Sequence, residues 1–105
     1  MRSILFVLLL APAAVLSIDI IVGKPTTGNQ CCNKGTPDES DTCGKQGLNS
    51  YCCCHKRNDE KGGCQGPEGI EGYPDGRTVL SFATGGCHTV NSVGDNLIGF
   101  IGCAK

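Results

Sequence analysis

Nine cysteines constrain this chain of 105 residues more than any other feature of its sequence. Such a density is typical of small secreted proteins that are stabilised by disulfides, because bridges persist outside the cell and are reduced in the cytosol. Eight paired cysteines allow about 105 pairings, so the sequence leaves the connectivity open. All nine are predicted to hold the fold: Cys31, Cys32, Cys43, Cys52, Cys53, Cys54, Cys64, Cys87 and Cys103.

The first seventeen residues have the pattern of a secretory signal peptide. Arg2 precedes an apolar run, and Val15 and Ser17 occupy the −3 and −1 positions if cleavage follows Ser17. The run is shorter than the ~20 residues that span a bilayer. The sequence therefore predicts a signal peptide over 1–17, a single disulfide-stabilised secreted domain over 18–105, and no membrane span.

The apolar residues and the cysteines are segregated along the chain. Residues 18–22 and 79–101 hold nearly all the large apolar side chains, whereas 23–78 holds seven cysteines with only Leu48 and Ile70. Burial of so few apolar side chains gives too little stabilisation for an unbridged fold, and each native disulfide adds ~2–5 kcal/mol. This distribution predicts a small, disulfide-rich, mainly β protein whose middle is a cross-linked, loop-rich segment and whose two ends supply most of the sheet.

An antiparallel meander is predicted for the C-terminal third, with turn residues between β-forming runs. The run over 18–23 is expected to be a further strand of the same sheet, and a short helical turn is expected within 38–47. The meander itself is predicted as a turn at 73–76, a strand over 77–84, a two-residue hairpin at Gly85-Gly86, a return over 87–93, a turn at 94–96 and a last strand over 97–103.

Adjacent cysteines point to opposite faces of an extended strand, so neighbours are expected to bridge to different places. An odd count leaves one thiol over, and the triplet Cys52–Cys54 is its expected place. That cysteine is free and buried, capped, or paired with a second chain in a disulfide-linked dimer.

Several functional classes are disfavoured by composition and spacing. Without Arg2, eight Lys and Arg face ten Asp and Glu, and there is no basic stripe for nucleic acid. The cysteine spacings do not fit zinc sites, no known catalytic motif occurs, and no cofactor is predicted. The neighbours Cys87 and His88 would face opposite ways in a strand, so we expect no enzyme.

Exposed loops on a rigid scaffold are where binding usually resides. We therefore take two loops, 55–61 and 65–77, as candidate contacts for an unknown host protein or surface ligand. Their candidate residues are His55, Lys56, Arg57, Asp59, Glu60, Lys61, Glu68, Glu71, Tyr73 and Arg77.

In architecture and composition the chain resembles the small secreted cysteine-rich proteins of filamentous fungi. Many of these are effectors, and the resemblance implies an extracellular protein that binds a host target and contributes to virulence. Two alternatives stay open: a toxin or antimicrobial that acts on competing cells, and a hydrophobin-like surface protein. Against the last, hydrophobin cysteines run single, double, single, single, double, single, whereas these run double, single, triple and then three singles.

Overall fold

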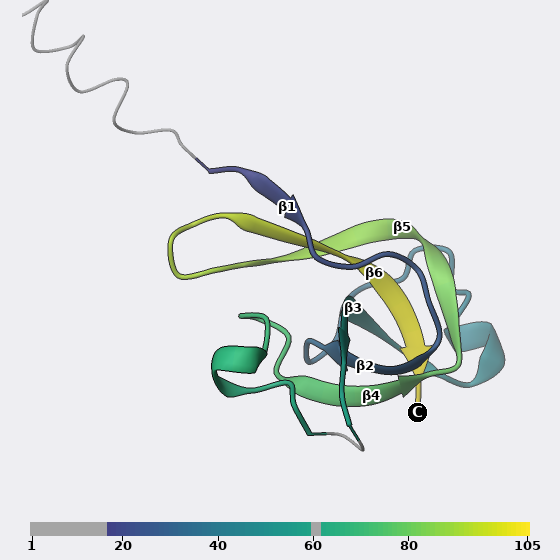
Figure 1. Cartoon of the computed structure of the whole chain (residues 1–105). Coiled ribbons are helices and arrows are strands. Elements are labelled where there is room, and N and C mark those ends of the chain that lie inside the picture. Colours follow the sequence, from purple (N-terminus) through teal and green to yellow (C-terminus); the bar gives the residue numbers. More distant parts are fainter. Residues whose placement is uncertain (1–16, 60–61) are drawn as a thin grey trace, which may run out of the picture.

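The computed structural model describes residues 17–59 and 62–105, and within them the protein is a six-stranded β structure (Figure 1). The predicted signal peptide lies outside the described residues apart from Ser17. The strands are β1 (Asp19–Ile21), β2 (Gly28–Cys32), β3 (Asn49–Arg57), β4 (Asp75–Val79), β5 (Ser81–Val90) and β6 (Asn96–Ala104). Two single 3₁₀ turns are present, η2 (Gly44–Gln46) and η3 (Gly66–Glu68).

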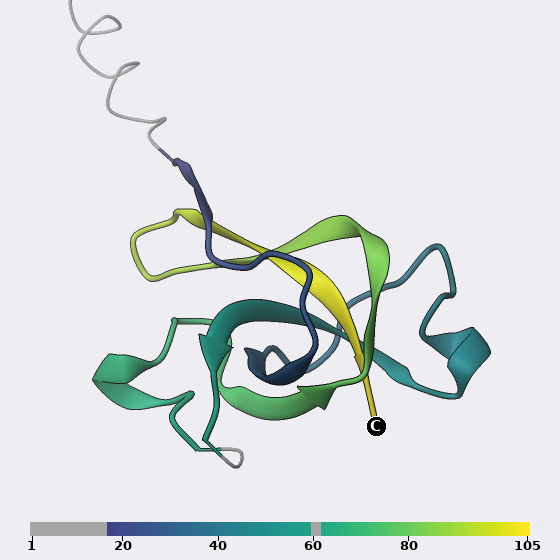
Figure 2. The same ribbon diagram turned by 45° about the vertical axis from the view of Figure 1, so that its right-hand side comes forward.

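Strand β6 is the hub of the sheet. The hydrogen-bonded order is β1-β6-β3-β2-β4, and β5 also pairs with β6. β1 runs parallel to β6, while all the other pairings are antiparallel. The sheet curls, and the β5–β6 hairpin projects from the curled part with β1 beside it (Figures 1 and 2).

Buried side chains lie on both faces of the sheet. One face carries Tyr51, Cys53, Phe100 and Ala104, which pack with Cys32 and Val79. The other face carries a cluster around Cys52, Tyr73 and Leu97 and a second one around Cys43, Ile101 and Cys103. Each cluster contains cysteine, so the bridges themselves form much of the core.

The four disulfides are Cys31–Cys64, Cys32–Cys53, Cys43–Cys103 and Cys52–Cys87. Adjacent cysteines separate as predicted: Cys31 and Cys52 belong to one cluster, and Cys32 and Cys53 belong to the cluster on the opposite face. The odd cysteine is Cys54, a member of the triplet, as predicted. The adjacent cysteines of β2 and β3 thus connect these neighbouring strands to the buried clusters on both faces of the sheet.

The mainly β class, the added strand near residue 20 and the helical turn at Gly44–Gln46 are confirmed. The expectation that the ends supply most of the sheet is confirmed, since β1, β5 and β6 hold more than half of the strand residues. The middle segment nevertheless contributes β2 and β3, both interior in the strand order. These strands bury sulfur in place of the missing aliphatic side chains: Cys31, Cys32, Cys52, Cys53 and Cys54 have no exposed surface.

The prediction of a two-residue hairpin turn at Gly85-Gly86 is wrong. Strand β5 runs through both glycines, and the register with β6 shifts between Phe82 and Gly86. Gly85 has φ +96°, a conformation that side chains disfavour and that β-bulges use. The glycines therefore bend one strand, and the predicted strand over 77–84 is instead divided near Leu80 between β4 and β5.

Candidate functional site

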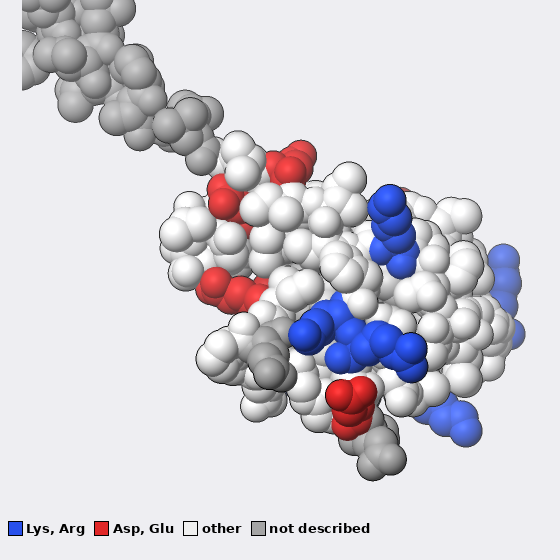
Figure 3. Space-filling model, viewed as in Figure 1, with Lys and Arg blue, Asp and Glu red and all other residues white. Residues whose placement is uncertain are grey.

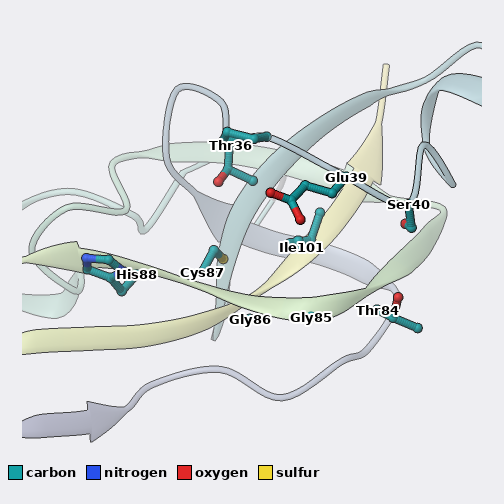
Figure 4. Close-up of a pocket in the computed structure, with 10 residues that line it drawn as sticks. Thr36, Glu39, Ser40, Thr84, Gly85, Gly86, Cys87, His88 and Ile101 are labelled. Atoms are coloured by element: carbon teal, nitrogen blue, oxygen red, sulfur yellow. The ribbon is translucent and has the colours of Figure 1, made fainter.

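A groove of about 580 Å³ lies between the loop after β2 and the bulged part of β5 (Figure 4). Its lining residues are Thr36, Pro37, Glu39, Ser40, Thr84, Gly85, Gly86, Cys87, His88 and Ile101. In Figure 4 the Glu39 carboxylate points toward Ile101 and β5, and His88 stands at the far end of the same stretch of β5.

The floor of the groove is apolar and rigid. Ile101 is 5% exposed and belongs to the cluster held by the Cys43–Cys103 bridge. Cys87 is half-buried and bonded to Cys52. Because its sulfur is in a disulfide, Cys87 has no thiolate to act as a nucleophile beside His88.

The loop wall of the groove is fixed by its own hydrogen bonds. Asp38 accepts from the Ser40 hydroxyl and from the Cys43 backbone N–H at 2.9 Å. These two bonds, the Ser40 one first, lower the pKa of Asp38 below its usual value. Thr36 joins the loop to β3, since its N–H donates to the Ser50 carbonyl at 3.0 Å and its carbonyl accepts from the Ser50 hydroxyl. The wall is therefore held in place in the absence of a ligand.

The strand wall exposes backbone. Within the described residues β5 pairs with β6 alone, so its other edge is open. Gly85 and Gly86 are exposed, and a Cβ built on Gly86 meets nothing within 4 Å. Hydroxyls of Thr84, Thr36 and Ser40 border this stretch. The site offers hydrogen-bonding groups over an apolar floor, which suits the binding of an extended, partly polar ligand.

The residues predicted from the first candidate loop lie elsewhere. His55, Lys56 and Arg57 form the end of β3, and Asp59 forms an isolated antiparallel bridge with Gly62. Glu60 and Lys61 lie outside the described residues. The first three candidates therefore belong to a strand and not to a loop.

The second candidate loop divides into exposed and buried positions. Glu71 is exposed and accepts from the Ser92 hydroxyl at 3.2 Å, and Glu68 ends η3, its side chain lying outside what the structure describes. Tyr73 is wrong as a contact residue: it is 0% exposed, and its hydroxyl donates to the Leu97 carbonyl at 2.6 Å. Burial raises its pKa.

Arg77, the last candidate, is half-buried within β4. Its guanidinium carbon lies 4.2 Å from the centre of the Tyr51 ring, a cation–π contact that stabilises the curled sheet. The groove is absent from the predicted contact residues, because its walls come from the loop at 36–40 and from a strand segment that the sequence predicts to be a hairpin turn. The glycine pair at 85–86 was the available signal.

The free thiol of Cys54 is a core group. Its side chain has no exposed surface, and burial raises its pKa above the usual value. A thiol of this kind reacts slowly, because the thiolate is the reactive form. The structure therefore offers no accessible sulfur at Cys54 for a bridge to a second chain.

No group of three or more potential metal ligands is found among residues 17–59 and 62–105. In the same part of the chain, no helix has the length and apolar character needed to cross a membrane.

The fold and the groove define a class: a small β protein cross-linked by four disulfides, with a preformed surface groove. Residues 25–104 match a family of unknown function, DUF6413, and the chain belongs to that family. No curated protein matches the chain, and no solved structure matches it.

Proposed function

We propose that this protein is secreted and acts by binding a target outside the cell that produces it, as a host-directed effector does. The four disulfides are compatible with an extracellular location. The predicted leader and the resemblance to small secreted cysteine-rich fungal proteins support the same proposal.

The observation that carries the binding role is the groove beside the bulged edge of β5. An extended peptide adds readily to an open sheet edge, where backbone bonds give affinity and nearby pockets give specificity. The bulge keeps Gly85 and Gly86 accessible, and the apolar floor at Ile101 receives a side chain of the peptide. The ligand class we propose is therefore an extended polypeptide segment of the target.

The test is peptide selection followed by variants. A displayed random-peptide library is selected on the oxidised mature protein, and the affinity of the best peptide is measured by calorimetry. Gly86→Arg adds a long side chain at a lining residue of the groove, where a new Cβ meets nothing within 4 Å, and we expect it to lower affinity at least about tenfold. Lys56→Glu, at the end of β3, is the matched control and should leave affinity unchanged.

If Gly86→Arg binds the peptide with the affinity of the parent protein, the groove is not the binding site. If Lys56→Glu loses binding, the contact lies in the segment 55–61. The effector role is tested separately by deletion of the gene in the producing organism. Reduced colonisation of the host supports it. Inhibition of competing cells by the pure oxidised protein would instead make it a toxin or antimicrobial.

A further inference from the structure

The projecting β1–β6–β5 ribbon has one covered face and one open face. The strand register places Ile20, Leu97 and Thr89 side by side on one face. The segment 70–73 covers that face: Tyr73 donates to the Leu97 carbonyl at 2.6 Å, and the Thr89 hydroxyl donates to the Glu71 carbonyl at 3.5 Å. Leu97 is accordingly buried.

The opposite face carries the alternate residues. Ile21 lies beside Ile98, and Asn96 lies between Asp19 and Val90. Ile21 is 66% exposed and Val90 is 56% exposed, while Ile98 is half-buried. His88, which is exposed, pairs with Ile98 and lies on the same face. We call the three apolar side chains with Asp19, His88 and Asn96 the open face. Along β6 it leads directly to Phe100, which is buried in the core, so a partner seated on it would extend that core.

The side chains around the open face are acidic rather than basic. Residues 17–23 and 81–104 contain no Lys or Arg, whereas Asp19 is exposed on the open face. Asp95 directly precedes β6, and its carboxylate accepts from the Ile18 nitrogen at 3.3 Å. Glu71, in the segment that covers the opposite face, is held to the hairpin loop by its hydrogen bond from Ser92. On the side seen in Figure 3, red carboxylates surround the ribbon end, and the blue side chains lie on the curled body.

We propose that the open face docks a basic amphipathic segment of a partner protein, in which apolar side chains and Lys or Arg lie on the same face of an extended chain. The apolar residues would cover Ile21, Ile98 and Val90, and a cation beside them would pair with Asp19. Complementary potentials are what select partners at interfaces. A second copy of the chain brings like charges together, and an anionic membrane repels the same carboxylates.

The proposal is independent of the groove, because its residues can be changed without filling the groove. The probe is a fluorescent ten-residue peptide with Leu and Lys taking turns along one face of an extended chain and Ser at the positions between them. It is compared with the same peptide carrying Glu in place of Lys. We expect the Lys peptide to bind the oxidised mature protein in low salt, and the Glu peptide to bind at least about tenfold more weakly.

Two variants test the two parts of the open face. Val90→Ser removes an exposed apolar group, and Asp19→Asn removes a charge while retaining a polar side chain that can meet Asn96. Each variant should lower the affinity for the Lys peptide at least about threefold. Thermal melts of both variants check that the fold is intact. Glu39→Gln, which removes a carboxylate from the loop wall of the groove, should leave this binding unchanged, which separates the open face from the groove.

Three results would overturn the proposal. Equal binding of the Lys and Glu peptides would show that charge does not select the partner. Concentration-dependent dimers in sedimentation, abolished by Val90→Ser, would assign the face to a second copy of the chain. Binding to vesicles with anionic headgroups, lost on Val90→Ser, would assign it to a lipid surface.

Discussion

Gly99 in β6 is the position where a single added methyl group should damage the fold most clearly. A Cβ built there would lie 2.3 Å from the Cys53 carbonyl oxygen, 2.9 Å from the Tyr73 hydroxyl and 3.2 Å from the Cys52 sulfur. The first of these atoms is backbone of the paired strand β3, and the last belongs to the bridge to Cys87. Neither neighbour can move as an exposed side chain would.

The magnitude of the Gly99→Ala effect follows from this crowding. Overpacking a well-filled core costs ~1–3 kcal/mol and occasionally more. Because the closest atom is backbone, we expect the upper end, about 3 kcal/mol of unfolding free energy. For a domain of this size each kcal/mol corresponds to roughly 4–8 °C in melting temperature, so Gly99→Ala should melt about 12–24 °C below the parent.

The assay is thermal and guanidinium unfolding of the oxidised protein, followed by circular dichroism. Gly86→Ala is the matched control, since a Cβ on that glycine of the same hairpin meets nothing within 4 Å, and it should change stability by less than about 1 kcal/mol. A Gly99→Ala protein that melts within about 4 °C of the parent would refute the reasoning and would show that β6 can move away from β3.

Two further predictions concern the ends of the chain. The Cys43–Cys103 bridge closes a sequence separation of 60 residues, and loop entropy assigns such a bridge roughly 4 kcal/mol, so Cys43→Ala with Cys103→Ala should lower the unfolding free energy by up to that amount; a loss under about 1 kcal/mol in urea titrations would contradict it. Cleavage after Ser17 would turn the Ile18 nitrogen, 3.3 Å from Asp95 Oδ1, into an ammonium ion. This exposed pair should add up to about 1 kcal/mol, and N-terminal acetylation and Asp95→Asn should therefore destabilise the mature protein non-additively, whereas fully additive effects in a double cycle would show that the pair contributes nothing.

The sequence alone determined that disulfides, more than an aliphatic core, stabilise the protein. The cysteine density and the shortage of aliphatic side chains predicted a disulfide-held β protein, and the period of two along a strand predicted that adjacent cysteines serve opposite faces. It also placed the odd cysteine within the triplet. These conclusions need only composition and local geometry, which do not depend on how the strands are paired.

Tertiary structure decided where the strands lie and where the groove forms. Residues 51–54 lie in the segment that is predicted to be loop-rich, because that prediction counts cysteine only as a cross-link. Cysteine is also one of the most buried residue types, so Tyr51 and the triplet form a continuous apolar run of the kind that central strands show. Gly85-Gly86 fits either a hairpin or a bulge, and pairing with β6 selects the bulge. Tyr73 follows a glycine-rich stretch, yet the covered face of the ribbon draws it into the core. In each case a non-local partner outweighs the local signal, because buried contacts and strand pairing stabilise more than turn propensity does.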